Sequence, residues 1–380
     1  MRILVLIIFS ISTIFSSEIK VGISAAFSGP AEKLGTNVRD GILTYFNKNN
    51  KSNTKHKFKL IAYDDGYEPK AAAKNMRKLI EEDKVLAVLG NVGTPTANVT
   101  VPIANEKKTL LFGAFTGAGV LRKNPPERYI INYRASYAQE TANMINGLLS
   151  IGIKPKEIAL FTQNDGYGNA GYFGVVRALN SRGLNHSIKK IQHGRYTRNT
   201  LNVEDGLSTI LDSLEDIKAV IIVGAYAPAA KFIKLAKEDF PNAYFLNVSF
   251  VGSEALKNAL GEETSNVIVT QVVPFYESDL PIVKEYLIDL KEYLPNAKPN
   301  FVSLEGYIVA KLFALAVNDL SSENISTENI INKILNMKNL DIGIGKKSDF
   351  NKNKYQFSDI IWPTIIKNNK FVELKWNELK

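Results

Sequence analysis

Val88-Leu89-Gly90-Asn91-Val92-Gly93-Thr94-Pro95-Thr96 is the stretch that decides the fold, because a glycine-bearing turn here joins an apolar run to a helical pattern. We expect a buried strand to end at Leu89 and a helix to follow, with Thr94 as its N-cap and Pro95 at its first position. The first N–H groups of such a helix, with the helix dipole, favour an anion beyond the strand end, where ligands bind in open α/β sheets. For this stretch alone, a simple helix cap remains an open alternative.

The same strand-to-helix order repeats along most of the chain. A good example of a helical segment is Pro69–Glu82, in which Ala73, Met76 and Leu79 fall on one face. Repeated alternation predicts an α/β fold with mainly parallel sheets flanked by helices. The predicted strands are Lys20–Ser24, Phe58–Tyr63, Val85–Leu89, Thr109–Phe112, Tyr129–Tyr133, Glu157–Phe161, Ala219–Val223, Ala243–Val248 and Val267–Gln271.

Two lobes are expected rather than one wide sheet, since the alternation pauses near Arg134 and changes again near Val272-Val273-Pro274. The predicted lobes are residues 18–134 with 274–345, and residues 135–273 with 346–380. Three transitions between them predict a hinge made of several crossing segments. Further predicted elements are helices at Tyr137–Leu149, Asp279–Leu294 and Ser303–Leu320, and strand-like runs at Ile360-Ile361-Trp362 and Phe371–Leu374.

The N-terminal 17 residues have the pattern of a secretory signal peptide: a short basic start, the apolar run Ile3–Phe9 and the small residues Ser10–Ser17. Cleavage is expected after Ser16 or Ser17. No cysteine follows, so no lipid anchor is expected, and no later apolar stretch is expected to span a bilayer. The mature protein is therefore predicted to be soluble and periplasmic, and not membrane-inserted.

Composition narrows the possible chemistry. The 380 residues carry a net charge of +9 and include no cysteine and three histidines, which leaves few options for a metal or a nucleophilic thiol. The lysine clusters lack interleaved arginines and aromatics, so no nucleic-acid partner is expected. His56, His186 and His193 lie among polar residues and are predicted to be solvated. Because no catalytic signature is present, we predict no catalytic residues, no metal and no cofactor.

Three further loops also follow predicted strands. Gly113-Ala114-Phe115-Thr116-Gly117-Ala118-Gly119 offers backbone groups, the Thr116 hydroxyl and an apolar wall at Phe115. Its glycine spacing is a poor match to a dinucleotide fingerprint. The other two loops place Tyr167 and Tyr226 at strand-to-helix turns, where a tyrosine can line a cleft with one hydroxyl. Taken alone, these two tyrosines are more often packing residues.

The order of these motifs resembles that of the type I periplasmic solute-binding proteins, and more closely the leucine/isoleucine/valine-binding group that serves ABC importers. The likeness covers essentially the whole mature chain. It rests on Ser28-Gly29-Pro30, Tyr63-Asp64-Asp65-Gly66, Gly90-Asn91-Val92-Gly93-Thr94, Phe115-Thr116-Gly117-Ala118, Asp165-Gly166-Tyr167-Gly168 and Ser303-Leu304-Glu305-Gly306-Tyr307.

The resemblance implies a two-lobed clamp in which a ligand binds between the lobes and the hinge closes over it. It implies that Thr94 binds a ligand carboxylate and that Phe115, Thr116 and Gly117 contact carboxylate and ammonium. Tyr167 and Tyr226 would line the cleft from the other lobe. The expected partners are a small-molecule ligand and an ABC importer permease, and the expected state is a monomer.

One departure from the family pattern concerns the ligand. Amino-acid-binding members often carry an acidic residue where this chain has Ser249, and a buried ammonium without a countercharge is costly. Either Glu254 or another acid replaces it, or the ligand is a simple carboxylate, an aromatic acid or an amide. Phe115 and Phe250 would favour apolar bulk. Two other functions remain open: a ligand-sensing receptor feeding a membrane kinase or regulator, and a secreted α/β hydrolase.

Overall fold

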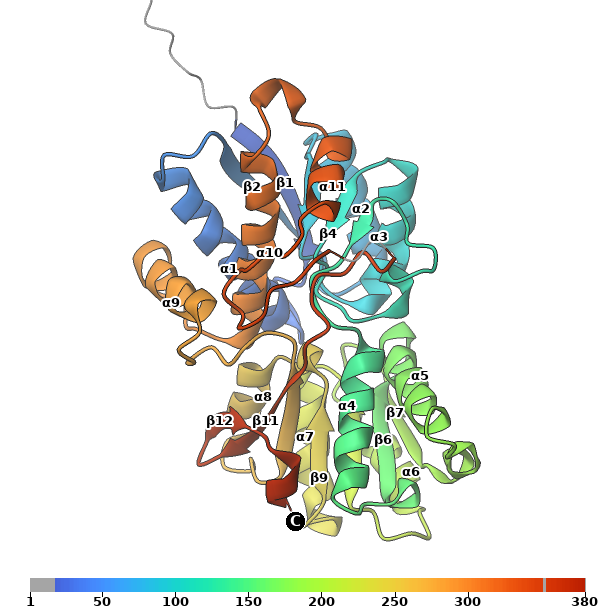
Figure 1. Cartoon of the computed structure of the whole chain (residues 1–380). Coiled ribbons are helices and arrows are strands. Elements are labelled where there is room, and N and C mark those ends of the chain that lie inside the picture. The colour runs from blue at the N-terminus through green and yellow to red at the C-terminus, as the bar shows by residue number, and fades with distance from the viewer. Residues whose placement is uncertain (1–17, 351–352, 380) are drawn as a thin grey trace, which may run out of the picture.

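A computed structural model describes residues 18–350 and 353–379, which form two connected α/β lobes, one above the other in Figure 1. The first lobe contains a parallel five-stranded sheet in the order β2-β1-β3-β4-β5. Most of its strand residues are buried, as expected for a parallel sheet that is covered on both faces, whereas the edge strand β2 is largely half-buried or exposed. They are β1 (Glu18–Ala25), β2 (Lys57–Asp64), β3 (Ala87–Leu89), β4 (Leu110–Phe112) and β5 (Ile130–Ile131).

The second lobe contains a seven-stranded sheet in the order β12-β11-β10-β9-β8-β6-β7. Its first five strands in the chain are parallel, and the two C-terminal strands add an antiparallel edge. The prediction of two mainly parallel sheets with flanking helices is therefore confirmed. The strands are β6 (Ile158–Gln163), β7 (His193–Tyr196), β8 (Ala219–Val223), β9 (Tyr244–Asn247), β10 (Val267–Gln271), β11 (Trp362–Lys367) and β12 (Lys370–Glu373).

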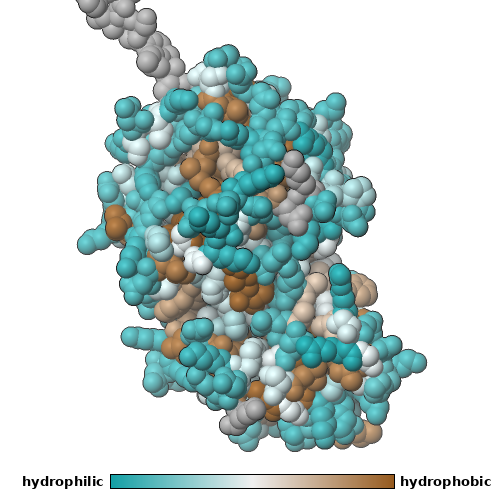
Figure 2. Space-filling model, in the orientation of Figure 1, coloured by the Kyte–Doolittle hydropathy of each residue, from teal (hydrophilic) through white to brown (hydrophobic). Residues whose placement is uncertain are grey.

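Helices cover both sheets, and Figure 2 shows that the face they present in this view is largely hydrophilic with scattered apolar spots. In the first lobe they are α1 (Glu32–Lys51), α2 (Pro69–Glu81), α3 (Thr94–Glu106), α9 (Pro281–Tyr293), α10 (Phe301–Asn318) and α11 (Thr327–Leu335). In the second they are α4 (Tyr137–Ser150), α5 (Gly166–Asn180), α6 (Glu204–Leu211), α7 (Tyr226–Asp239) and α8 (Ser253–Leu260).

Helices α1 and α10 lie unusually close to each other. A Cβ atom at Gly41 would lie 1.9 Å from the Ser303 carbonyl oxygen, and one at Gly306 would lie 2.3 Å from the Val38 carbonyl oxygen. Helix α10 is long and apolar enough to span a membrane by length and composition, contrary to the expectation from sequence. It is 83% buried between its neighbours, which is the environment of a core helix.

Three segments cross between the lobes, as predicted. The first follows β5, the second follows β10, and the third precedes β11. They contact one another: Tyr133 donates from Oη to the Val272 carbonyl at 3.3 Å, and its own carbonyl accepts from the Ser358 N–H at 2.8 Å. Phe350, which was expected in the second lobe, packs on Phe112 of the first sheet with ring centroids 6.2 Å apart, so the third crossing comes later than residue 346.

The prediction that all three histidines are solvated is wrong for His56, while His186 is exposed as predicted and His193 is half-buried. His56 is fully buried, with Nε2 3.1 Å from the Leu320 carbonyl oxygen. His193 belongs to β7, a strand that sequence analysis missed, and its Nε2 lies 2.7 Å from Thr162 Oγ1. Burial, with repulsion from Arg195, lowers the pKa of His193 to about 4. The predicted signal peptide, residues 1–17, lies outside the described residues.

Candidate functional site

The loops after β3 and β4 of the first lobe meet the start of α4 between the lobes. Thr94 is the first residue of α3 and not its N-cap, because Gly93 occupies that position with φ +101°, a conformation that favours glycine. The Thr94 hydroxyl is thus free for Thr116, and the two Oγ1 atoms lie 2.8 Å apart. Pro95 accordingly stands at the second helical position instead of the first.

This pair of hydroxyls continues into the second lobe. Thr116 donates from Oγ1 to Tyr137 Oη at 3.1 Å, and Tyr137 is the first residue of α4. Burial raises the pKa of Tyr137 to about 12, so its phenol stays neutral at physiological pH. Three buried hydroxyls therefore form a line that runs from the N-terminus of α3 across the interface between the lobes.

Aromatic rings from both lobes pack beside these hydroxyls. Phe250, in the short helical turn after β9, has its ring centroid 4.6 Å from Tyr167, 5.5 Å from Phe115 and 5.9 Å from Tyr67. Tyr167 is also 5.3 Å from Tyr137. All five rings are buried, so this structure holds the two lobes in contact at the predicted site.

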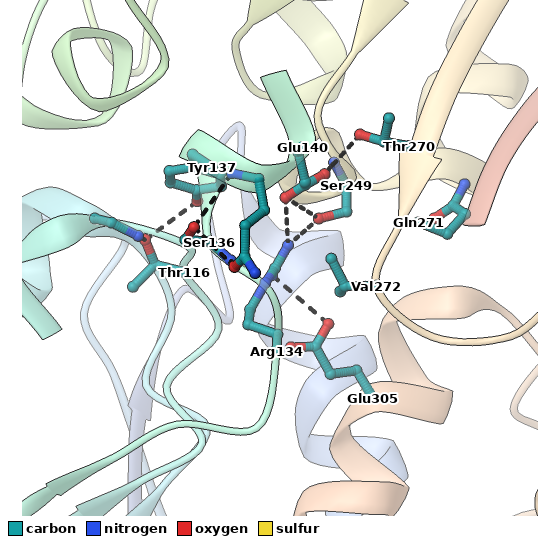
Figure 3. A network of polar contacts seen from close by, with 12 residues as sticks. Thr116, Arg134, Ser136, Tyr137, Glu140, Ser249, Thr270, Gln271, Val272 and Glu305 are labelled. Atoms are coloured by element: carbon teal, nitrogen blue, oxygen red, sulfur yellow. Dashed lines mark hydrogen bonds and ion pairs between the residues drawn. The ribbon is translucent and has the colours of Figure 1, made fainter. Parts of the chain in front are cut away.

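A buried charged cluster, which we call the hinge cluster, lies next to the aromatic rings and consists of Arg134, Glu140, Ser249, Thr270 and Glu305 (Figure 3). Arg134 is on the first crossing segment and Glu305 is on α10 of the first lobe, whereas the other three residues belong to the second lobe. Arg134 Nη2 lies 3.4 Å from Glu140 Oε1 and also contacts the Ser249 hydroxyl, while Nη1 lies 3.6 Å from Glu305 Oε2. The cluster therefore joins the two lobes through one guanidinium.

The two carboxylates of the hinge cluster differ in their surroundings. Glu140 accepts hydrogen bonds from the Ser249 N–H at 2.7 Å, the Ser249 hydroxyl at 3.0 Å and the Thr270 hydroxyl at 2.6 Å. The Oε1 atom of Glu305, by contrast, is buried without a hydrogen-bond partner among the described residues. Burial, opposed by Arg134, raises the pKa of Glu305 to about 7.

The structure brings only some of the predicted ligand-binding residues together. Thr94, Phe115, Thr116 and Tyr167 lie side by side between the lobes, as the contacts above describe. The Gly117 carbonyl accepts from the Tyr137 N–H at 2.9 Å, and Ser249 is engaged by the hinge cluster. Tyr226 lies apart from this group: it is half-buried, and near it a Cβ on Gly252 would meet Leu34 of α1.

Sequence reasoning missed five residues of this site: Tyr67, Arg134, Tyr137, Glu140 and Glu305. The only local signal was at Tyr137, which opens a helix directly after the first crossing with a Ser136–Gln139 capping box. Arg134 and Glu140 are neighbours in the chain, but Glu305 comes from a distant helix, so no spacing in the sequence could have grouped all three charged residues.

The open side of the interface carries polar contacts between the lobes. Arg198 pairs with Glu68 of the first lobe at 2.9 Å and, within its own lobe, with Asp165 at 3.3 Å, and Asn199 donates to Glu68 at 2.7 Å. Gln163 donates to Tyr67 Oη at 3.3 Å. Because Glu68 is half exposed, its contacts contribute little to stability, and the closed arrangement depends more on the buried rings.

Comparisons with known proteins agree with this architecture. A family model described as periplasmic binding protein matches residues 18–364. The crystal structure of a possible leucine/isoleucine/valine-binding protein from Rhodopirellula baltica SH 1 is 45% identical, with a TM-score of 0.93 over 97% of this chain and 99% of that chain. No curated protein matches the chain.

Two more distant structures share the fold. A substrate-binding periplasmic protein from Ralstonia solanacearum is 24% identical, with a TM-score of 0.84 over 94% of this chain and 100% of that one. A branched-chain amino acid ABC transporter protein from Thermus thermophilus with bound valine is 16% identical, with a TM-score of 0.81 over 95% of this chain and 96% of that one.

Proposed function

The chain belongs to the periplasmic binding protein family, and from this premise we propose that it is an extracytoplasmic solute-binding protein of an ABC importer. It binds a small carboxylate-bearing ligand between its lobes: an amino acid, an organic or aromatic acid, or a related amide. The similar Rhodopirellula baltica protein, described as possibly leucine/isoleucine/valine-binding, supports this ligand class. The proposal includes export through a signal peptide at residues 1–17, release into the periplasm as a monomer, delivery to a permease, and no catalytic activity.

The observation that carries the proposal is the line of hydroxyls from Thr94 through Thr116 to Tyr137. Thr94 is at the N-terminus of a 13-residue helix, where unpaired N–H groups and the helix dipole favour negative charge. The hydroxyls come from both lobes and are shielded from water. A carboxylate that binds among them gains contacts from each lobe only when the lobes are closed.

Ligand entry requires the lobes to separate, because the site residues are in mutual contact in this structure. The three crossing segments provide a hinge for such a motion. A ligand shifts the equilibrium toward closure by its difference in affinity for the two arrangements. Closure around a carboxylate would thus signal occupancy to a permease.

The experiment that tests the proposal is a thermal-shift screen of residues 18–380 against amino acids, aliphatic and aromatic carboxylates, and short amides. A ligand at 100 times its Kd stabilises the folded state by about 2.7 kcal/mol, a clear shift in Tm. Stabilisation by carboxylates and not by the matching alcohols is expected. If no member of the library shifts the Tm, the proposed ligand class is wrong.

A Thr94→Val variant tests the hydroxyl line with little change in volume. We expect the Kd for the best carboxylate of the screen to rise about 10- to 100-fold, since a hydrogen bond to a charged group contributes about 1.5–3 kcal/mol. Isothermal titration calorimetry measures this change. The matched control is Thr100→Val in the same helix, because Thr100 is buried with its hydroxyl unpartnered among the described residues. An unchanged Kd in Thr94→Val would remove Thr94 from the site.

A further inference from the structure

We propose that Glu305 binds a cationic group of the ligand, the ammonium of an amino acid, in the crevice between Phe115, Ser249 and α10. This inference rests on the proposed function, because it places the ammonium beside the hydroxyls that hold the carboxylate. It narrows the ligand class from carboxylates in general to amino acids. It also supplies the acidic partner that Ser249 does not provide.

The first argument is the unequal division of partners within the hinge cluster. Glu140 receives three hydrogen bonds and the nearer contact of Arg134. Glu305 has a 3.6 Å ion pair with Arg134 Nη1, which is too long for a hydrogen bond. Its Oε1 is buried with no donor in residues 18–350 and 353–379. Buried carboxylate oxygens are rarely left without a donor, so Glu305 is the carboxylate of the cluster that has bonding capacity to spare. Among the donors of the cluster, Arg134 Nε and Nη1 are also buried without a hydrogen-bond partner in the described residues.

The second argument is the crevice that the Glu305 side chain lines. Glu305 lines a narrow crevice together with Phe115, Ser249, Gln271 and Val272, and in this closed structure the crevice has no room for a water molecule. Phe115 and Ser249 are also predicted ligand-binding residues, so the crevice is continuous with the proposed carboxylate site. Separation of the lobes would widen it, since its walls come from both lobes and from the second crossing segment.

The third argument is charge. With both carboxylates ionised, Arg122 and Arg134 together balance Glu140 and Glu305, so these four buried groups carry no net charge. The guanidinium of Arg122 donates hydrogen bonds to the carbonyls of Thr116, Ala118 and Arg134. Burying an uncompensated charge is costly. A ligand carboxylate without a cation would add one uncompensated negative charge to this neutral group, whereas an amino acid brings its own ammonium and adds no net charge.

Glu254, the other acid considered from the sequence, is already engaged. It forms an ion pair with Lys257 at 2.7 Å and accepts a hydrogen bond from Tyr276 Oη. Its carboxylate therefore has less capacity for a ligand cation than Glu305 has. This makes Glu254→Gln a suitable control for the test that follows.

The test compares ligand pairs that differ only in the ammonium group: L-leucine with 4-methylpentanoate, and L-phenylalanine with 3-phenylpropanoate. Calorimetric titration of residues 18–380 at pH 8 should give an amino-acid Kd at least about 30-fold lower than that of its partner, equivalent to about 2 kcal/mol. In Glu305→Gln this ratio should fall to near one, while Glu254→Gln should keep the wild-type ratio. If Glu305→Gln keeps the preference, the assignment of Glu305 is wrong.

A second measurement needs no variant. The pKa of free Glu305 is raised to about 7 by burial, with Arg134, Glu140, Arg122 and Tyr133 as the ionisable groups that face it. A bound ammonium favours the ionised carboxylate, so below pH 7 each amino acid must bind with loss of a proton. The Kd of L-leucine should rise about tenfold per pH unit below 7 relative to that of 4-methylpentanoate. A ratio that stays constant between pH 5.5 and 8 would overturn the proposal.

The outcomes separate the two proposals. If the carboxylates bind as well as the amino acids, the hydroxyl site stands and the role of Glu305 fails. If neither member of any pair binds and Thr94→Val alters nothing, the proposed function itself fails.

Discussion

Replacing Arg134 with methionine is expected to lower the free energy of unfolding by about 3–5 kcal/mol, because it removes the cation that contacts two buried carboxylates. Arg134 is 1% exposed and is the cation that contacts both Glu140 and Glu305. Methionine keeps much of the packing against Phe115, whose ring lies 4.9 Å from the guanidinium. The loss of stability should therefore reflect the missing positive charge and not a change in side-chain volume.

Urea unfolding monitored by circular dichroism measures this loss. The control is Arg77→Met, which breaks an ion pair with Glu106 whose side chains are about half exposed, and it should leave the unfolding midpoint nearly unchanged. Adding Glu140→Gln and Glu305→Gln to Arg134→Met should recover part of the stability, because the unpaired charges are then gone. Equal effects of the two arginine variants would show that the hinge cluster does not depend on its guanidinium.

A Gly41→Ala substitution is expected to cost about 3 kcal/mol, although alanine is normally the better helix former by about 1 kcal/mol. The added Cβ would lie 1.9 Å from the Ser303 carbonyl oxygen and 2.7 Å from the Tyr307 nitrogen, so α1 and α10 must move apart. The collision with backbone atoms outweighs the gain in helix propensity, so the substitution should lower the free energy of unfolding. Since Glu305 lies between these two residues of α10, the same shift should also weaken discrimination between L-leucine and 4-methylpentanoate.

Gly119→Ala is the matched control for this prediction. A Cβ at Gly119 meets no atom within 4 Å and its backbone conformation is open to alanine, so stability should stay within about 0.5 kcal/mol. Thermal and urea unfolding of both variants give the comparison. A Gly41→Ala protein that is as stable as Gly119→Ala would mean that α1 and α10 tolerate a wider separation.

The sequence predicted the fold in most of its parts because the parallel strands are continuous apolar runs, which have a strong local signal. Strands β8 and β10 have the predicted bounds. Strand β7 was missed since its His193-Gly194-Arg195-Tyr196 run is short and polar, and it becomes a strand only by pairing with β6. His56 was misplaced for a similar reason, because its burial depends on Leu320, which is distant in the chain.

From the sequence, only those site residues could be predicted that belong to a local motif. Thr94 and Thr116 follow strands in glycine-bearing turns, and their juxtaposition follows from the parallel order of β3 and β4. Glu140 and Glu305, by contrast, lie within ordinary amphipathic or apolar helices. Only the packing of both lobes around the crossing segments brings these carboxylates to one guanidinium.

The three crossings have a practical consequence, because they leave β1 in one lobe and β12 in the other (Figure 1). The chain contains no cysteine, so cysteines introduced at exposed Lys74 on α2 and Ser208 on α6 would be the only two thiols. Donor and acceptor dyes on these thiols would turn each closing event into a change in energy transfer. Single molecules could then be watched as they open and close, and the same labelled protein would serve as an optical sensor for its own ligand.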